Sequence, residues 1–401
     1  MERKFLARPF SFLCRTLAAA ALLLAGSPAW AAEAPFDINI FLPLTGGAAF
    51  LGKSEKETIS LAEKAINQQG GIAGRPVRFV LHDDQSSPQT AVQLANTVMA
   101  EHPNIIIGPT LVATCNAISP FMQKGPVNYC FSPGIHPQAN SYVFSASVST
   151  VDLERVLIRY FRLRGWTRLA LITSTDATGQ DAQHGIAGIL AEPENAGIKM
   201  VASTHFNPHD VSVAAQMATI GAAKPQALIA WSTGAAIATV FKGIAGAGLD
   251  IPVATTDGNM THAQMTQYAP FLPKQLFIPA AVWVKHGAEL KLDPQVEAAQ
   301  KRFYGAFDAA GVLPDLPATL AWDTIMIVTD ALRHTGVTAD AATLRHYLAD
   351  LRGYGGINGV YDFVKTPQRG LAEEDTLVTL WNAADQNWNP VSKPGGQPLQ
   401  R

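Results

Sequence analysis

Two adjacent acids, Asp83 and Asp84, stand between the apolar run VRFVL and a helix-like stretch that begins near Ser87. Two carboxylates that face one another can hold a metal ion or hydrolyse a glycoside. In an extended segment, however, successive side chains point to opposite faces, so these two acids cannot aim at one ligand. We therefore expect one of them to face solvent and the other to help cap the helix.

Other patterns that carry chemistry are weak. The nearest match to a dinucleotide-binding glycine loop, GIAGAG at 243–248, has its spacing reversed and follows a helix-like stretch rather than a strand. His205 and His209 lie four residues apart, but the Asn-Pro pair between them disfavours the helix that would bring both rings to one metal. The sequence has no G-x-S-x-G or H-E-x-x-H pattern. We expect no catalytic residue, no metal site and no cofactor.

The first 31 residues have the features of an export signal. Basic residues precede the apolar run LAAAALLLA, and Ala29-Trp30-Ala31 supplies the small residues that a signal peptidase accepts. The run is too short for a stable membrane span, and no later segment approaches the roughly 20 apolar residues that a span needs. No cysteine follows the small residues to carry a lipid anchor. We expect a cleaved, soluble protein in the periplasm.

The charge of the remaining chain argues against nucleic acid as a partner. Removal of residues 1–31 takes away four of the 30 basic residues and one of the 32 acidic residues, which leaves a net charge of about −5. Nucleic-acid binding depends on neutralising phosphates with Lys and Arg, so an acidic chain is a poor candidate.

Two cysteines, Cys115 and Cys130, remain after the signal. In an oxidising compartment they could form a disulfide, and closing a loop of about 15 residues would contribute roughly 3 kcal/mol. The alternative is a pair of buried thiols, since free Cys is among the most buried residue types.

Strand-like and helix-like stretches alternate along most of the chain. Apolar runs from INIFL (38–42) to YVFSAS (142–147) form one series, and the amphipathic stretch 151–164 opens a second that ends with QLFIP (275–279). In the first helix, Ser54 and Glu57 have the spacing of a capping box. This alternation predicts two α/β lobes with parallel sheets. Residues 294–351 are mainly helical in pattern, and 389–401 are expected to form a flexible tail.

Several motifs together resemble a known family. The loop LTGGAAFLG, the stretch AINQQGGIAGRPVRFVLHDDQSSPQTAV and the motifs IIIGPT, GPVNYCFSPG, TTDG and AWDTIMIVTDAL resemble, in order and spacing, the periplasmic substrate-binding proteins of Leu/Ile/Val-type ABC transporters. The resemblance covers residues 37–382. It implies the type I periplasmic-binding fold, in which two Rossmann-like α/β lobes with parallel sheets flanked by helices are joined by three crossovers.

The resemblance also implies how the chain divides. The crossovers are expected near residues 148, 280 and 356. Lobe 1 would then comprise residues 36–147 and 281–355, and lobe 2 would comprise residues 148–280 and 356–388.

The ligand site is expected where the strands of both lobes end, because ligands of open α/β sheets sit beyond the carboxyl ends of the strands. In the family, lobe 1 holds the ligand carboxylate with backbone amides and hydroxyls; here the expected Ser falls on Val112, which removes one donor. Asp257 matches the acid that leucine-type binders set against the ligand ammonium, or else it is a turn residue before Gly258. Trp231 either touches the ligand or packs in the core. The resemblance implies these ligand-binding residues: Phe50, Leu51, Thr110, Leu111, Val112, Thr114, Ser132, Gly134, Asp176, Thr178, Trp231, Ser232 and Asp257.

The function that the resemblance implies is binding, not catalysis. A monomeric exported protein would close on a small carboxylate and deliver it to the permease subunits of an ABC transporter. A hydrophobic amino acid is the first expectation for the ligand, and an aromatic or short aliphatic acid without an amine is the second, because Val112 departs from the amino-acid pattern. A ligand sensor for a membrane receptor and an exported hydrolase are the other classes considered.

Overall fold

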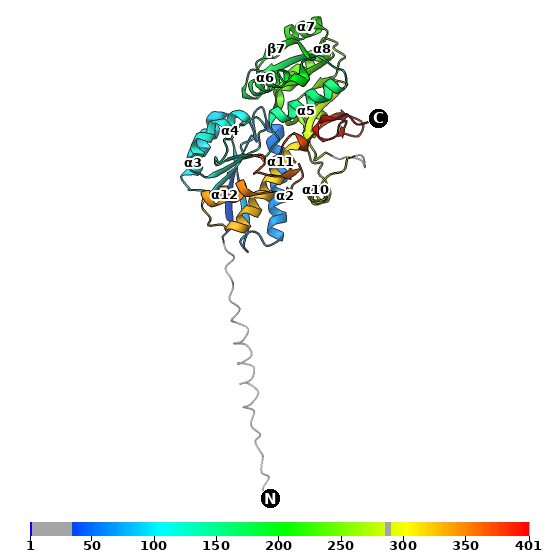
Figure 1. Ribbon diagram of the computed structural model, residues 1–401. Helices are drawn as coiled ribbons and strands as arrows, with labels where there is room; N and C mark the ends of the chain where they lie inside the picture. The colour runs from blue at the N-terminus through cyan, green and yellow to red at the C-terminus, as the bar shows by residue number, and fades with distance from the viewer. Residues whose placement is uncertain (2–33, 285–289, 401) are drawn as a thin grey trace.

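The computed structural model describes residues 1, 34–284 and 290–400 of the 401-residue chain, which fold into two lobes (Figure 1). The expected export signal lies outside the described residues except for Met1. Among the described residues, no helix combines the length and the apolar character that crossing a membrane requires.

The sheet of lobe 1 has five parallel strands in the order β2-β1-β3-β4-β5. Strand β1, which pairs with β2 and β3, is apolar on both faces, as expected of a parallel sheet covered by helices on both sides. Ile38 and Ile40 face one hydrophobic core, whereas Phe41 faces another. The strands are β1 (Phe36–Leu42), β2 (Val77–Asp83), β3 (Ile105–Ile107), β4 (Val127–Cys130) and β5 (Val143–Ser145).

Helices cover both faces of this sheet. Ala91, Ala95 and Val98 of α3 pack in the same core as Phe41, while α2 and α11 pack against each other on the opposite face. Ser87 caps α3 by accepting a hydrogen bond from the Thr90 amide. The helices of lobe 1 are α2 (Ala49–Gln68), α3 (Pro88–Met99), α4 (Val112–Ile118), α10 (Pro294–Ala310), α11 (Leu316–Thr335) and α12 (Ala341–Asp350).

The sheet of lobe 2 has seven strands in the order β14-β13-β10-β9-β8-β6-β7. The five strands from β10 to β7 in this order are parallel, and β13 and β14 extend the edge in antiparallel fashion. The strands are β6 (Arg168–Ser174), β7 (Lys199–Phe206), β8 (Ala227–Trp231), β9 (Val253–Ala254), β10 (Leu276–Ala281), β13 (Thr376–Asn382) and β14 (Asn387–Pro390). The helices are α5 (Thr150–Leu163), α6 (Ala177–Leu190), α7 (Ala214–Ala223), α8 (Ile237–Gly246) and α9 (His262–Tyr268).

The third passage between the lobes differs from the prediction of residue 356. A hairpin of β11 (Tyr354–Gly355) and β12 (Val360–Tyr361) stays in lobe 1, where the buried Asp323 carboxylate of α11 holds it. Asp323 accepts hydrogen bonds from the amides of Ile357 (2.9 Å) and Asn358 (3.0 Å) and from the Tyr361 hydroxyl (3.0 Å). The chain therefore stays in lobe 1 beyond residue 356, and the predicted position is too early. The contacts that hold the hairpin join segments more than 30 residues apart, so no local sequence pattern signals them.

The residues after this hairpin also bind lobe 1. Buried Arg369 donates to the Ser145 hydroxyl (2.8 Å) and to the Ile135 carbonyl (2.6 Å), so the chain rejoins lobe 2 only as it approaches β13.

The C-terminal residues are packed, which corrects the prediction of a flexible tail over 389–401. The Val391 amide donates to the Val378 carbonyl (2.8 Å), and Arg159 donates to the Gly395 carbonyl (2.7 Å). Gly396 lies at φ +87°, where a Cβ would stand 2.6 Å from the Val156 carbonyl oxygen, so glycine is required there. Composition suggested disorder, but these hydrogen bonds anchor the segment to lobe 2.

A disulfide joins Cys115 of α4 to Cys130 of β4, with the Cα atoms 6.2 Å apart. We predict that the unreduced, denatured protein is lighter than the reduced form by two hydrogen atoms and resists alkylation at both cysteines. Replacing both by alanine should lower the free energy of unfolding by roughly 3 kcal/mol for this loop of 15 residues. Alkylation of both residues in unfolded, unreduced protein would show that the bridge is absent.

Candidate ligand-binding site

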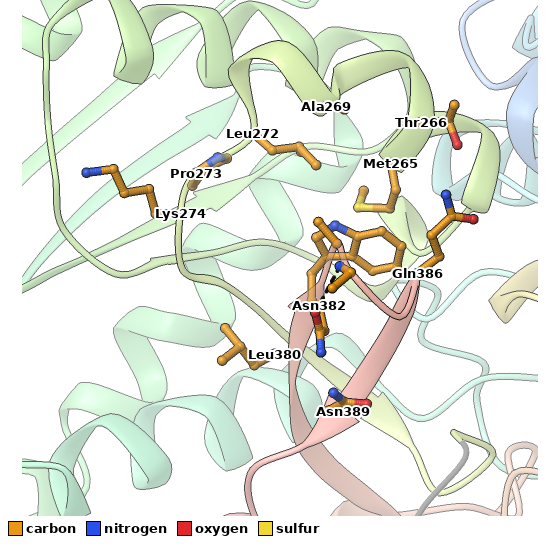
Figure 2. Close-up of a pocket in the computed structure, with 13 residues that line it drawn as sticks. Met265, Thr266, Ala269, Leu272, Pro273, Lys274, Leu380, Asn382, Gln386 and Asn389 are labelled. Carbon is orange, nitrogen blue, oxygen red and sulfur yellow. Dashed lines mark hydrogen bonds between the residues drawn. The ribbon is translucent and has the colours of Figure 1, made fainter.

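The described part of the structure has several hollows, and two of them are compared as candidate sites. Figure 2 shows the first, a groove of about 600 Å³ on lobe 2 between α9 with the loop after it and the β13–β14 hairpin. Its one charged lining residue, Lys274, is exposed and pairs with Asp250 (2.7 Å). This groove brings no buried ionisable group toward a ligand.

The second hollow lies between the lobes and is much tighter, with free volume of about 30 Å³, room for one or two water molecules. Lobe 1 contributes α2, the loops after β3 and β4, and the start of α11; lobe 2 contributes the loops after β8 and β9 and the starts of α5 and α6. Most of these segments follow the carboxyl ends of strands, where α/β sheets bind ligands. We take this interlobe cavity as the candidate site.

Eight of the ligand-binding residues expected from the sequence line the interlobe cavity. Asp257 begins a short 3₁₀ turn (Asp257–Asn259) and also faces the cavity, so its two interpretations are compatible. Trp231 is fully buried and belongs both to the core and to the cavity wall. The expected residues that line the cavity are Leu51, Thr110, Leu111, Val112, Ser132, Thr178, Trp231 and Asp257.

The other expected residues lie beside the cavity rather than on its wall. Phe50 packs edge-on against Tyr268, 6.0 Å between ring centres. The Thr114 hydroxyl donates to the Leu111 carbonyl (3.1 Å). Asp176 caps α6 through the Gly179 amide (3.1 Å). The remaining two residues are Ser232, whose side chain is buried, and Gly134, which lies at the contact between the lobes.

Several lining residues were missed. Thr233 and Gly258 directly follow the expected residues Ser232 and Asp257 in sequence. Leu316, Pro317 and Leu320 belong to α11, which begins more than 250 residues after Glu55. Glu55 was missed because the capping-box pattern at Ser54 suggested that the helix begins there. The structure begins α2 at Ala49, so Ser54 and Glu55 are one turn inside it, and Ser54 bonds to Asp315 instead. The other missed residues are Phe131, Pro133, Thr150 and Thr256.

The electrostatic character of the cavity is acidic. Burial raises the pKa of Asp257 to about 6 and the pKa of Glu55 well above its usual range, and burial also raises the pKa of neighbouring Asp315 to about 7. No Lys, Arg or His is among the residues that line the cavity. Leucine, valine, phenylalanine and tryptophan side chains make up much of the rest, so the cavity combines apolar walls with a few polar groups, as small-ligand sites do.

The two acids that opened the sequence analysis lie outside the cavity wall. Asp83 accepts hydrogen bonds from the Thr45 hydroxyl (2.7 Å) and amide (3.2 Å), and so ties the loop before α2 to β2. Asp84 is buried and accepts from the Ser86 amide (2.8 Å). The two acids do not act as a pair on one ligand, but the prediction that one is in solvent and one caps α3 is wrong, since Ser87 provides the cap.

The stretch GAAFLGKS at 47–54 matches the letters of a phosphate-binding loop, so the expectation that the sequence contains no such pattern is wrong. The structure gives it another role. Residues 49–54 are already helical, Lys53 is exposed, and a Cβ on Gly52 would lie 2.3 Å from the Pro43 carbonyl oxygen. Gly52 therefore permits close packing of α2 on the preceding loop, and no phosphate cradle forms.

The profile of the family described as "Periplasmic binding protein" matches residues 35–386. The chain belongs to this family. Its members are binding proteins, and the two-lobe fold described above is the one they share.

Individual relatives differ in how much of the chain they match. The Leu/Ile/Val-binding protein homolog 1 of Brucella abortus (strain 2308) is 32% identical over 92 residues, 23% of this chain and 24% of the relative, so the match spans about a quarter of that protein. A periplasmic binding protein type 1 from Bordetella pertussis Tohama I has a TM-score of 0.77 at 20% identity, over 91% of this chain and 100% of that one. A solute-binding protein of an R. palustris ABC transporter, solved in complex with benzoate, has a TM-score of 0.74 at 18% identity, over 92% of this chain and 98% of that one.

The two lobes of the binding protein touch one another at the edges of the cavity. The Ala235 amide of lobe 2 donates to the Gly47 carbonyl of lobe 1 (2.9 Å). His136 of lobe 1 lies 2.5 Å from an Asp181 carboxylate oxygen of lobe 2. Next to this pair, a Cβ on Gly134 would lie 2.8 Å from Asp181, so glycine permits the lobes to approach this closely.

The His136–Asp181 pair predicts a pH dependence of closure. The hydrogen bond with Asp181 raises the pKa of His136. The stabilisation of the interlobe contact by this pair is therefore complete at pH values below the ordinary pKa of His136. It is lost as the pH rises through the raised pKa. His136 is largely exposed, so the effect is modest: we expect His136→Gln to weaken ligand binding about two- to fivefold at about pH 5.5 and not at about pH 8.5. Calorimetric titration at both pH values checks this, and an equal loss at both would exclude the ion pair as its cause.

Proposed function

We propose that this protein is exported to the periplasm, binds a small hydrophobic amino acid between its lobes and delivers it to the permease of an ABC importer. The observation that supports this most strongly is the interlobe cavity, in which the buried Asp257 carboxylate faces apolar walls that include Leu111, Trp231 and Leu320. A carboxylate can pair with the ligand ammonium, while the walls accept an apolar side chain. The named amino acids of the Brucella relative agree with this ligand class.

Entry of such a ligand requires the lobes to move. A free volume of about 30 Å³ is too small for an amino acid, so the lobes must part to admit it and then close around it. The direct contacts at Gly47 and His136 are of the kind that a hinge motion can break and remake.

An aromatic or short aliphatic carboxylate without an amine is the second candidate. Val112 lacks the hydroxyl that an amino-acid site is expected to place there, and the R. palustris neighbour binds benzoate. Asp257 would then lie near an anion, which is unfavourable unless the carboxyl is protonated.

A thermal-shift screen separates the two ligand classes. A ligand at 100 times its dissociation constant stabilises the protein by roughly 2.7 kcal/mol, which is readily detected. We expect stabilisation by at least one of leucine, isoleucine, valine or phenylalanine. Stabilisation by benzoate or 4-methylpentanoate with none by any amino acid would favour the second candidate. Uptake of the ligand into cells that carry or lack this chain then separates a transport role from sensing.

A further inference from the structure

Glu55 is, besides Asp257, the ionisable residue among those that line the cavity, and the proposed function gives it no role. It lies on α2 one turn after Leu51, is fully buried and lines the cavity. Its Oε2 accepts a hydrogen bond from the Thr110 hydroxyl (2.8 Å). Its Oε1 is buried and has no hydrogen-bond partner among the described residues. A polar atom left in this state inside a cavity is costly unless a ligand completes its hydrogen bonding.

The surroundings of Glu55 favour its neutral form. Burial is the main cause of its raised pKa, and the acids Asp84 and Asp315 on neighbouring elements act in the same direction. Asp257 is the acid on the lobe 2 wall, and the charged residues next to Glu55 on its own helix, Lys53, Lys56 and Glu57, are exposed. A neutral carboxyl has one O–H donor; with Thr110 donating to Oε2, we assign the proton to Oε1, which has no other partner among the described residues. It requires an acceptor.

The lobe 1 wall has few hydroxyl donors left for a ligand carboxylate. Val112 has no hydroxyl, the Thr110 hydroxyl donates to Glu55, and the Thr114 hydroxyl donates to the Leu111 carbonyl. Ser132 is the remaining hydroxyl on this wall, so Oε1 of Glu55 would supply a second side-chain donor to a ligand carboxylate bound in lobe 1.

We propose that Glu55 contacts the ligand directly and donates a hydrogen bond from Oε1 to the ligand carboxylate. This inference rests on the proposed function and deepens it: lobe 1 selects a carboxylate through a neutral acid, while lobe 2 selects an amine through an ionised one. The ligand class is then an acid whose carboxylate is itself ionised and accepts this bond.

Three variants test the contact, with L-leucine as the probe and benzoate in its place if leucine does not bind. Glu55→Gln keeps an N–H donor of similar shape and cannot ionise, so its affinity should stay within about threefold of wild type. Glu55→Leu removes the donor and should weaken binding about tenfold or more. Glu57→Gln changes an exposed acid of the same helix and should bind as wild type does.

The pH dependence of ligand affinity provides a second test, because it would not differ between wild type and Glu55→Gln if Glu55 had only a structural role. As the pH rises, ionisation of Glu55 replaces a donor with a second negative charge beside the ligand carboxylate, so wild-type affinity should fall relative to that of Glu55→Gln. The Glu55→Gln variant lacks this ionisation. Ionisation of Asp257 affects both proteins alike and cancels in the comparison.

The outcomes separate this inference from the function on which it rests. Equal losses in Glu55→Gln and Glu55→Leu, or parallel pH profiles for wild type and Glu55→Gln, overturn the inference while the proposed function stands. If Glu55→Leu does not fold, comparing the pH profiles of wild type and Glu55→Gln still tests whether Glu55 contacts the ligand. Failure of leucine, benzoate and 4-methylpentanoate to bind wild type overturns the proposed function, and the Glu55 contact with it.

Discussion

Replacing Asp257 by alanine is expected to weaken binding of a hydrophobic amino acid by a factor on the order of 30 or more. In the closed cavity the ligand ammonium would lie against a carboxylate that is 2% exposed. Removing one partner of a desolvated charge pair typically costs about 2 to 5 kcal/mol, because the other charge stays buried and unpaired, and about 1.4 kcal/mol corresponds to a factor of ten. Because burial raises the pKa of Asp257 to about 6, titrations belong near pH 8, where the carboxylate is ionised.

The matched control for Asp257 is a ligand without the amine. For 4-methylpentanoate, the deaminated analogue of leucine, Asp257→Ala should cost about 1 kcal/mol or less, or should improve binding, because it removes a negative charge near an anion. Asp257→Asn preserves the hydrogen bond with Thr256 and should lose amino-acid affinity in the same way as alanine. If leucine and its analogue lose equal affinity, Asp257 does not bind the ammonium and the amine-free carboxylate becomes the better proposal.

Replacing Asp323 by alanine should have the largest effect on stability, about 3 kcal/mol or more. This carboxylate is 2% exposed and accepts from two backbone amides, the Asn358 side chain and the Tyr361 hydroxyl. Its loss leaves several buried donors unpaired and frees the β11–β12 hairpin from α11. Hydrogen exchange of the Ile357 and Asn358 amides should rise by orders of magnitude, and the urea midpoint should fall.

Asp330 provides the control on the same helix. It is partly exposed, and among the described residues its carboxylate pairs with Tyr347 and His334, so Asp330→Ala should change stability by about 1 kcal/mol or less. Unchanged amide exchange at residues 357 and 358 in Asp323→Ala would mean that the hairpin is held by packing rather than by this carboxylate.

Local patterns predicted the framework of the molecule well. Alternating apolar and amphipathic stretches are direct consequences of burying a parallel sheet between helices, and so the strands from β1 to β10 were found where the pattern placed them. The cap at Ser87 was predictable for the same reason, because an N-cap depends on residues only three positions away.

Features that depend on distant contacts were not predictable. The antiparallel edge formed by β13 and β14, the hairpin bound to Asp323 and the packed residues near Gly396 all depend on partners far away in sequence. Glu55 was missed for a different reason. The capping-box pattern placed the start of α2 at Ser54, five residues after its start at Ala49, so no sequence pattern indicated that Glu55 lies inside the helix on the side that faces the cavity.

The most direct test of the account is a crystal structure of the protein with its tightest-binding ligand. We predict one ligand between the lobes, with its apolar part against Leu111, Trp231 and Leu320, its amine within hydrogen-bond distance of Asp257, and its carboxylate facing lobe 1 near Glu55. A ligand in the groove of Figure 2, or a ligand between the lobes without any contact to Asp257, would contradict it.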